Sequence, residues 1–224
     1  CDGVCKTPGV VVAKKAAEKM NCKHYTNIDN LLENHPEINI MIVCTETEMH
    51  ESIVKTSARA GKHVICEKPM GLRMIEAKRM VEACKNKGVK LFIVKQNRYN
   101  LPIVKLKEAL DAGRFGDLFF LNVTVRWSRG QDYYDQAEWH SKKNGGGGVL
   151  MNQLTHHLDM IYYFGGEVES VHCIKKTFAH NIEVEDGVVA ILKFKNGALG
   201  TIEGSTCAFP NDIEGSISVL GKKG

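Results

Sequence analysis

The stretch His63-Val64-Ile65-Cys66-Glu67-Lys68-Pro69-Met70 decides the fold. Its first four residues form a short apolar and β-branched run after Gly61, which predicts a strand over residues 63–66. Pro69 disfavours the helical region for Lys68 and keeps it extended. The lysine therefore falls just beyond the carboxyl end of a strand, where open α/β sheets bind their ligands. An exposed lysine before a proline is the alternative, and it is the commoner meaning of an isolated Lys-Pro pair.

Strands and helices alternate on both sides of this stretch. Apolar spacing and end signals predict helices over 8–20, 28–34, 50–60 and 73–87, and strands over 40–44, 63–66 and 90–94. Such alternation is typical of a parallel, doubly wound Rossmann-type sheet. We therefore expect an α/β fold with a dinucleotide-binding domain over residues 1–96.

A Rossmann sheet normally begins with a strand and a Gly-x-Gly-x-x-Gly turn that holds a pyrophosphate. None of the 21 glycines forms a set with that spacing, so we expect the sequence to start at the end of the second strand, with the domain truncated at its N-terminus. Asp2 could then be the acidic residue that binds a ribose hydroxyl. A solvated aspartate near a terminus is the alternative.

The pattern changes after Val94. A helix is predicted over 102–112, a long strand over 118–127, a polar loop over 128–147 and a helix over 150–164. Further strands are expected over 168–178, 187–195, 198–206 and 217–220, with Asn196-Gly197 as a hairpin turn. Successive strands without helices between them favour an α+β domain over residues 97–224, with a largely antiparallel open sheet, truncated at its C-terminus.

One predicted helix carries a polar stripe. Asn152, His156, Asp159 and Tyr163 are spaced by four, three and four residues, which places them on one face. A solvated face with a histidine on it explains this spacing equally well. The run of four glycines at 145–148 favours a site instead, because glycine lets the backbone pass close to a ligand or to another domain. A flexible surface loop is the alternative for these glycines.

Composition excludes several classes. The chain is 43% hydrophobic and 25% charged, which is typical of globular proteins rather than disordered ones. No apolar run approaches the roughly 18 residues of a membrane span, and no secretory leader opens the sequence, so we expect a cytoplasmic protein without a membrane partner. The net charge of +4 is spread along the chain, so we expect no nucleic-acid partner.

The eight cysteines do not form a metal-binding pattern. There is no Cys-x-x-Cys pair and no Cys/His set at zinc spacing. We therefore expect reduced thiols and no metal. Cys44 and Cys66 end apolar runs, where a small buried hydrophobic residue is the natural interpretation.

Taken together, these motifs resemble the Gfo/Idh/MocA family of nicotinamide-dependent sugar and cyclitol oxidoreductases over nearly the whole chain. The resemblance is carried by Cys44-Thr45 with His50, by Gly61-Lys62-His63-Val64 leading into Glu67-Lys68-Pro69-Met70, and by the glycine run before Asn152, His156 and Asp159. In that family the lysine of Glu-Lys-Pro and the helix histidine face the substrate carbon and the nicotinamide. This implies catalytic roles for Lys68 and His156.

The resemblance also implies the remaining site residues and the cofactor NAD. With Asp2, the expected cofactor-binding residues are Thr45, His50, Glu67 and Lys68. The expected substrate-binding residues are Asn97, Arg98, Arg126, Trp127, Tyr134, Asn152 and Asp159. Asn152 and Glu46 depart from the wider family pattern, where many members have aspartate and proline.

Within the family, the chain looks most similar to UDP-N-acetylglucosaminuronate 3-dehydrogenases of surface-polysaccharide pathways. The segments that carry this similarity are Gln96-Asn97-Arg98-Tyr99-Asn100, Val125-Arg126-Trp127 with Tyr133-Tyr134 beyond it, and Met151-Asn152-Gln153. The arginine and aromatic residues between 96 and 139 suit a nucleotide-sugar, because arginine forks match phosphate oxygens. An ordinary subunit interface is enriched in the same residue types. We expect a homo-oligomer, a dimer or a tetramer. An inositol or free-sugar dehydrogenase, and a non-catalytic sugar- or dinucleotide-sensing regulator, are the alternatives.

Overall fold

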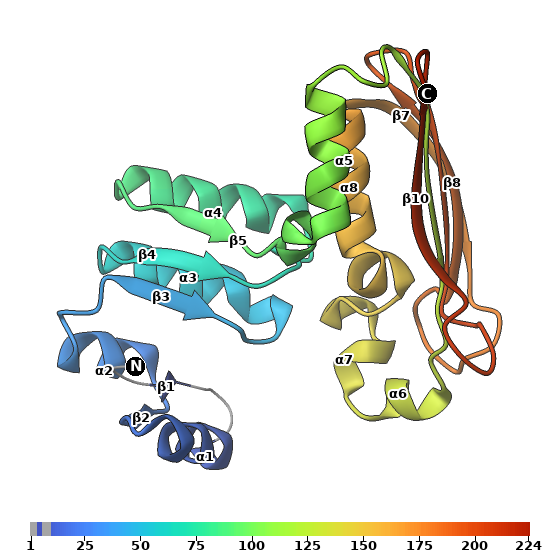
Figure 1. The fold of residues 1–224 in the computed structure, drawn as a ribbon. Helices are drawn as coiled ribbons and strands as arrows, with labels where there is room; N and C mark the ends of the chain where they lie inside the picture. The colour runs from blue at the N-terminus through green and yellow to red at the C-terminus, as the bar shows by residue number, and fades with distance from the viewer. Residues whose placement is uncertain (1–3, 6–9) are drawn as a thin grey trace. The chain divides into compact units, whose positions relative to one another are not determined.

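The computed structural model describes residues 4–5 and 10–224, and their contacts divide the chain into two compact units, Cys1–Val94 and Lys95–Gly224 (Figure 1). Strand–helix alternation in the first unit and a strand-rich second unit confirm the predicted fold class. Among the described residues, no helix is both long and apolar enough to cross a bilayer.

The first unit contains two parallel sheets. Strands β3, β4 and β5 form one sheet in that order, and β1 and β2 form a two-residue pair. The pair was not predicted, because two residues are too few for a periodic signal. The elements are β1 Val4–Cys5, α1 Val10–Met20, β2 His24–Tyr25, α2 Ile28–Asn34, β3 Ile40–Val43, α3 His50–Arg59, β4 His63–Cys66, α4 Met74–Asn86 and β5 Leu91–Ile93.

The core of the first unit lies between this sheet and two helices. Val54 and Ala58 of α3 and Met80 of α4 pack on Val64 and Cys66 of β4. Alternation along β4 buries these two strand residues and leaves their neighbours partly exposed. Burial raises the pKa of the Cys66 thiol to about 12, with Cys44 and Glu67 adding to the shift. Cys66 is therefore a core residue, in agreement with its predicted role, whereas Cys44 is exposed, so the prediction of a buried residue there is wrong.

The second unit is a five-stranded sheet with helices on one face. The strand order is β10-β6-β9-β8-β7, and every neighbouring pair is antiparallel except β6 and β9, so the sheet is mixed. Figure 1 shows α5 and α8 side by side along the sheet. The elements are α5 Leu101–Asp111, β6 Leu118–Arg126, α6 Gln131–Asp135, α7 Glu138–Ser141, α8 Thr155–Gly165, β7 Val168–Lys176, β8 Gly187–Phe194, β9 Leu199–Ser205 and β10 Glu214–Gly221.

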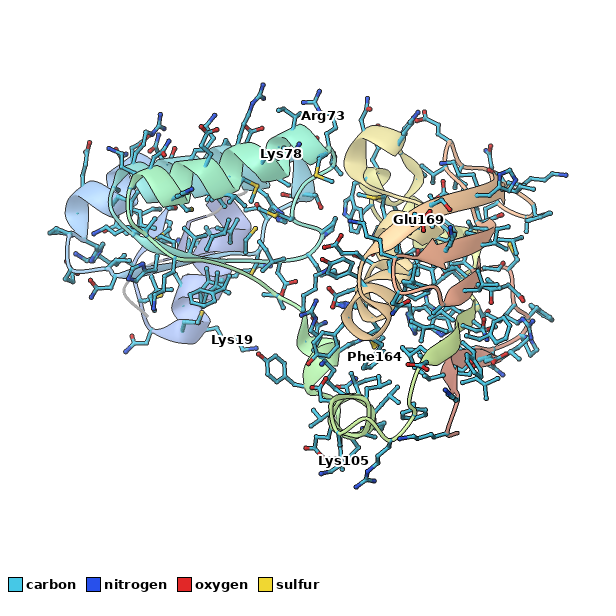
Figure 2. The ribbon with its side chains drawn as sticks, turned by 90° about the horizontal axis from the view of Figure 1, so that it is seen from above. Lys19, Arg73, Lys78, Lys105, Phe164 and Glu169 are labelled. Atoms are coloured by element: carbon cyan, nitrogen blue, oxygen red, sulfur yellow. The ribbon has the colours of Figure 1, made fainter. Side chains whose placement is uncertain are left out.

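Helix α8 is fixed to the sheet by its apolar face. Phe164 and Met160 pack against Leu121, Val123 and Val125 of β6 in one buried cluster. Figure 2 shows Phe164 on this helix and Glu169 on the edge strand β7. Because the apolar residues of α8 face the sheet, the helix presents its polar stripe on another side.

The prediction of a polar loop over residues 128–147 is wrong, because this segment contains α6, α7 and a 3-10 turn at Lys143–Gly145. The buried Tyr134 holds this segment on the sheet through a hydrogen bond of 2.8 Å between its hydroxyl and that of Thr206. Helices of four or five residues are too short to show a helical period, so the sequence signal here is only polarity.

The glycine run packs within its own unit. A Cβ at Gly147 would lie 2.2 Å from the carbonyl oxygen of His140. Gly148 has a φ of +93°, and a Cβ there would lie 2.8 Å from Glu185 Oε1. These glycines therefore let the chain pass α7 and the buried Glu185 closely, and the close approach is to protein.

Glu185 also fixes the start of the polar helix. Its Oε1 accepts the N–H of Leu150 at 3.2 Å, and its Oε2 lies 2.9 Å from Lys175 Nζ. The first predicted turn of this helix is a π-turn over Val149–Gln153, and α8 itself begins at Thr155. A π-turn changes the angular spacing between Asn152 and His156 from that of a regular helix.

Candidate active site

Lys68 lies two residues beyond the end of β4. The backbone N–H of Glu67 still bonds to the carbonyl oxygen of Val43 at 2.9 Å, as a continuation of the parallel ladder. The Glu67 carboxylate then turns back and accepts the N–H of Lys68 at 3.1 Å. The Lys68–Pro69 peptide bond is cis. Lys68 is thus partly exposed at the carboxyl end of its strand, as the sequence predicted.

The far end of the same segment is also held. Glu76 of α4 accepts the N–H groups of Leu72 and Arg73 at 2.9 and 3.1 Å, and its other oxygen lies 2.6 Å from Arg73 Nε. The side-chain hydrogen bond from Arg73 is the largest of the effects that lower the pKa of Glu76. The ends of the segment from Glu67 to Arg73 are therefore anchored within the first unit, by β4 and by α4.

Thr45 and His50 differ in their access to a ligand. Thr45 lies two residues beyond β3 and is partly exposed. His50 is 0% exposed, and its ring nitrogens lie 3.0 Å from the carbonyl oxygens of Pro69 and Thr45. The prediction that His50 contacts the cofactor is therefore wrong for this arrangement, because both polar atoms of its side chain face the backbone.

In the second unit, His156 on α8 is paired with a residue that was not predicted as part of the site. Gln96, in the 3-10 turn Gln96–Tyr99, has its amide nitrogen 3.3 Å from His156 Nε2. With the amide nitrogen as the donor, Nε2 accepts, and a neutral ring in that tautomer carries its proton on Nδ1. In that tautomer Nε2 is the basic nitrogen of His156. Pairing across 60 residues gives no sequence signal.

Asp159 binds two basic side chains, one in the 3-10 turn Gln96–Tyr99 and one just before it. Arg98 donates to it with Nε and Nη2 at 2.6 and 2.7 Å, and Lys95 Nζ lies 3.7 Å away. These hydrogen bonds raise the pKa of the Arg98 guanidinium. The guanidinium also lies 4.3 Å from the ring centre of Tyr163. Asp159 thus forms a salt bridge that holds Arg98 beside α8, and the predicted substrate contacts of the two residues stay predictions.

Asn152 contacts Tyr133, which was not predicted as a site residue; the tyrosine predicted to bind substrate was its neighbour, Tyr134. The Asn152 amide donates to the Tyr133 hydroxyl at 2.8 Å, and the Tyr133 ring stacks on that of His140 at 4.3 Å. Tyr134 is 1% exposed, and burial raises its pKa. The prediction that Tyr134 binds substrate is therefore wrong, and its neighbour holds the position beside Asn152.

Arg126 lies on the opposite face of the sheet from α8. Its neighbour Val125 is buried under the helix, and alternation turns Arg126 the other way. There its guanidinium binds Glu203 at 2.6 and 2.8 Å and Glu214 at 3.2 Å. Arg126 therefore lies apart from the residues on the helix side of the sheet, and its predicted substrate contact stays a prediction. Trp127 is on the helix side, with its ring edge-on to His157.

Two further predictions have different outcomes. Asp2 lies outside the described residues, so its proposed ribose contact stays a prediction. In the part of the chain that the structure describes, one group has atoms close enough to hold a metal, His180, Asp186 and Cys207. The Asp186 carboxylate already accepts N–H groups from Phe178, Ala179 and His180. These hydrogen bonds show that the Asp186 carboxylate has a structural role, because it holds the backbone of residues 178–180.

Comparison with known proteins identifies both units. Residues 7–95 match the oxidoreductase family with the NAD-binding Rossmann fold, and residues 103–224 match the GFO/IDH/MocA C-terminal domain. Myo-inositol 2-dehydrogenase of Thermotoga maritima is 33% identical over 210 residues, which are 90% of this chain and 59% of that protein.

Two solved structures are similar over 99% of this chain. The WlbA dehydrogenase from Bordetella pertussis, in complex with NADH and UDP-GlcNAcA, has a TM-score of 0.94 at 37% identity, with 63% of its chain covered. WlbA from Chromobacterium violaceum, with the same ligands, has a TM-score of 0.95 at 36% identity, with 64% covered. The chain thus spans about three fifths of the length of these relatives. It belongs to the Gfo/Idh/MocA family of oxidoreductases, and its first unit is that family's NAD-binding Rossmann domain.

Proposed function

We propose that this chain is part of an NAD-dependent dehydrogenase that oxidises the C3 hydroxyl of UDP-N-acetylglucosaminuronate. The similarity to the two WlbA structures solved with NADH and UDP-GlcNAcA carries this proposal. The finer predictions of a surface-polysaccharide pathway, a homo-oligomer and a cytoplasmic location stay predictions.

The cofactor would lie at the carboxyl ends of β3 and β4. Thr45 and Glu67 follow these neighbouring parallel strands and are both partly exposed. Open α/β sheets bind dinucleotides at this edge. Bound NAD would supply a hydride acceptor at C4 of its nicotinamide. Lys68, one residue further on, is the side chain that we place beside the reacting carbon.

In the proposed reaction the alcohol loses two hydrogens, one as a hydride to NAD and one as a proton to a side chain. The carbon-bound hydrogen leaves as hydride, and the hydroxyl proton passes to His156 Nε2, the nitrogen that can accept a proton when Nδ1 carries the hydrogen. Lys68 donates a hydrogen bond to the same oxygen and stabilises its developing negative charge. The two roles can also be exchanged, because a lysine in a desolvated site can act as a base.

The experiment that tests the substrate is NAD reduction by the full-length protein with three alcohols in parallel. UDP-N-acetylglucosaminuronate is expected to give the highest kcat/KM, above UDP-N-acetylglucosamine and myo-inositol. Inositol is the second candidate, because a myo-inositol 2-dehydrogenase is 33% identical to this chain. Turnover of inositol without turnover of the uronate would overturn the substrate assignment and leave the dehydrogenase class in place.

We predict that the full-length protein binds NAD at least about tenfold more tightly than its 2′-phosphorylated form, because Asp2 would accept a hydrogen bond from the ribose 2′-hydroxyl and repel a phosphate. Isothermal titration with both cofactors measures the ratio. Asp2→Ala is expected to narrow it, whereas Asp29→Ala, at an exposed position on α2, is the matched control. Equal or tighter binding of the phosphorylated form would remove Asp2 from this role.

A further inference from the structure

We propose that His50 is a positioning residue that holds Lys68 in place through the backbone, an inference that rests on the proposed function. His50 is the first residue of α3 and is fully buried. Its Nδ1 lies 3.0 Å from the carbonyl oxygen of Pro69, and its Nε2 lies 3.0 Å from that of Thr45. The side chain therefore joins two loops, and its burial excludes direct contact with a ligand.

The two loops carry the residues that we assign to cofactor and substrate. Strands β3 and β4 pair in parallel, with Val43 opposite Cys66. Thr45 lies two residues beyond β3, and Pro69 lies three residues beyond β4, directly after Lys68. A single ring thus connects both chain segments just outside the sheet.

Pro69 makes this contact important for Lys68. A proline has no backbone N–H, so the polar backbone atom of Pro69 is its carbonyl oxygen. On one side of it, Glu67 accepts the N–H of Lys68. On the other side, Glu76 holds Leu72 and Arg73. The bond from His50 falls between these two anchors and fixes the residue that follows Lys68.

The two ring nitrogens allow the two contacts to be tested separately. A carbonyl oxygen only accepts, so each bond needs an N–H on the ring, and a neutral ring, which has one N–H, donates to only one of the two carbonyl oxygens at a time. The amide nitrogen of asparagine can occupy the place of Nδ1, and that of glutamine the place of Nε2. His50→Asn therefore keeps a donor for Pro69, and His50→Gln keeps a donor for Thr45.

We expect His50→Gln in the full-length protein to lower kcat about 10- to 100-fold, since misplacing a reacting group by about 1 Å can cost 100-fold. His50→Asn is expected to retain kcat within about threefold of wild type and to weaken NAD binding more than His50→Gln does. NAD reduction gives kcat and KM, and fluorescence titration gives the dissociation constant. All variants are assayed below their melting temperatures, so that loss of fold is not counted as loss of positioning.

Ser57→Ala is the matched control. Ser57 lies on the same helix, is fully buried and donates to the carbonyl oxygen of Ile53 at 2.8 Å, within the helix. Its removal is expected to lower the melting temperature and leave kcat unchanged. An equal loss of kcat in Ser57→Ala and His50→Gln would show that disturbing the helix is sufficient, and the positioning role would be overturned.

A double variant separates this inference from the proposed function. If His50 acts through Lys68, then adding His50→Gln to Lys68→Ala causes no further loss of kcat. If the fold-losses of kcat in the two single variants multiply in the double variant, the inference is overturned and Lys68 keeps its catalytic role. Wild-type kcat in His50→Gln, with Lys68→Ala inactive, would also overturn the inference alone. Near-wild-type turnover of Lys68→Ala itself would overturn the catalytic role of Lys68 and the inference with it, whereas absence of uronate turnover in the wild-type protein would overturn the proposed function.

Discussion

Replacing Lys68 or His156 by alanine in the full-length protein is expected to lower kcat by at least about 100-fold, the size typical of losing a general acid–base group. Lys68 is placed at the carboxyl end of β4 by a strand ladder and a carboxylate bond. His156 Nε2 lies 3.3 Å from the Gln96 amide nitrogen. In the proposed mechanism both groups act on the oxygen only as its charge develops, so we expect kcat and kcat/KM to fall together.

Two exposed residues of the same types serve as controls. Lys78 is exposed on α4, as Figure 2 shows, and His172 is exposed on β7. Lys78→Ala and His172→Ala are expected to leave NAD reduction unchanged. Near-wild-type turnover in both Lys68→Ala and His156→Ala would contradict the mechanism, whereas a wild-type protein that binds NAD but turns over none of the three alcohols would favour a sensing regulator built on the same fold.

Local signals were sufficient to predict most elements of the fold. Helices α3 and α4 end next to glycines at positions 61 and 88, as expected of C-terminal caps. The apolar run at Ile40–Val43 forms a strand within one residue of its predicted end. These features depend on neighbours along the chain, so the sequence displays them directly.

The contacts that were missed at the site involve partners that are distant in sequence. Arg126 was assigned to a diphosphate, but its carboxylate partners Glu203 and Glu214 lie 77 and 88 residues away on adjacent strands. Which face of β6 a residue occupies depends on the register with β9 and β10, and a strand with partial alternation does not reveal it. Tyr133 and Tyr134 show the same problem. The two neighbours are of one residue type, so the sequence does not tell which side chain points into the core and which points toward Asn152.

His50 shows how a correct motif can receive a wrong role. Its position at the start of a helix was predicted, and the family resemblance suggested a place beside the cofactor. The structure turns the ring inward to Thr45 and Pro69. Two backbone carbonyl oxygens leave no trace in a sequence, so only coordinates can separate a ligand contact from a support for the loops that make one.

Asp186 is the residue whose loss is expected to destabilise the second unit most. Its carboxylate is 0% exposed and accepts the N–H groups of Phe178, Ala179 and His180 at 2.7 to 3.1 Å. His180 Nδ1 lies 2.8 Å from the same carboxylate, and His180 Nε2 lies 2.8 Å from the carbonyl oxygen of Arg129. One buried carboxylate thus ties the β7–β8 connection to the segment that carries Tyr133.

We expect Asp186→Asn to lower the free energy of unfolding by about 3 kcal/mol, since each buried N–H donor left unsatisfied typically costs about 1 to 3 kcal/mol. The amide nitrogen would also face backbone N–H groups with which it cannot bond. Urea unfolding followed by tryptophan fluorescence reports on this unit, because both tryptophans, Trp127 and Trp139, lie within it. Asp117→Asn, at an exposed aspartate, is expected to change stability by less than about 0.5 kcal/mol.

We also expect the stability difference between wild type and Asp186→Asn to depend on pH, in a direction that follows from the lowered pKa of Asp186. Burial alone would raise the pKa of Asp186, but hydrogen bonds from Ala179, Phe178 and His180 outweigh it, so the pKa in the folded protein lies below its usual value. A carboxyl with a lowered pKa stabilises the fold above its unfolded pKa, about 3.9, and this contribution is lost as pH falls through the folded value. The stability difference between wild type and Asp186→Asn should therefore be largest near pH 7 and shrink below about pH 4. A difference that stays constant from pH 7 to pH 3 would mean that the carboxylate's charge does not provide the stabilisation.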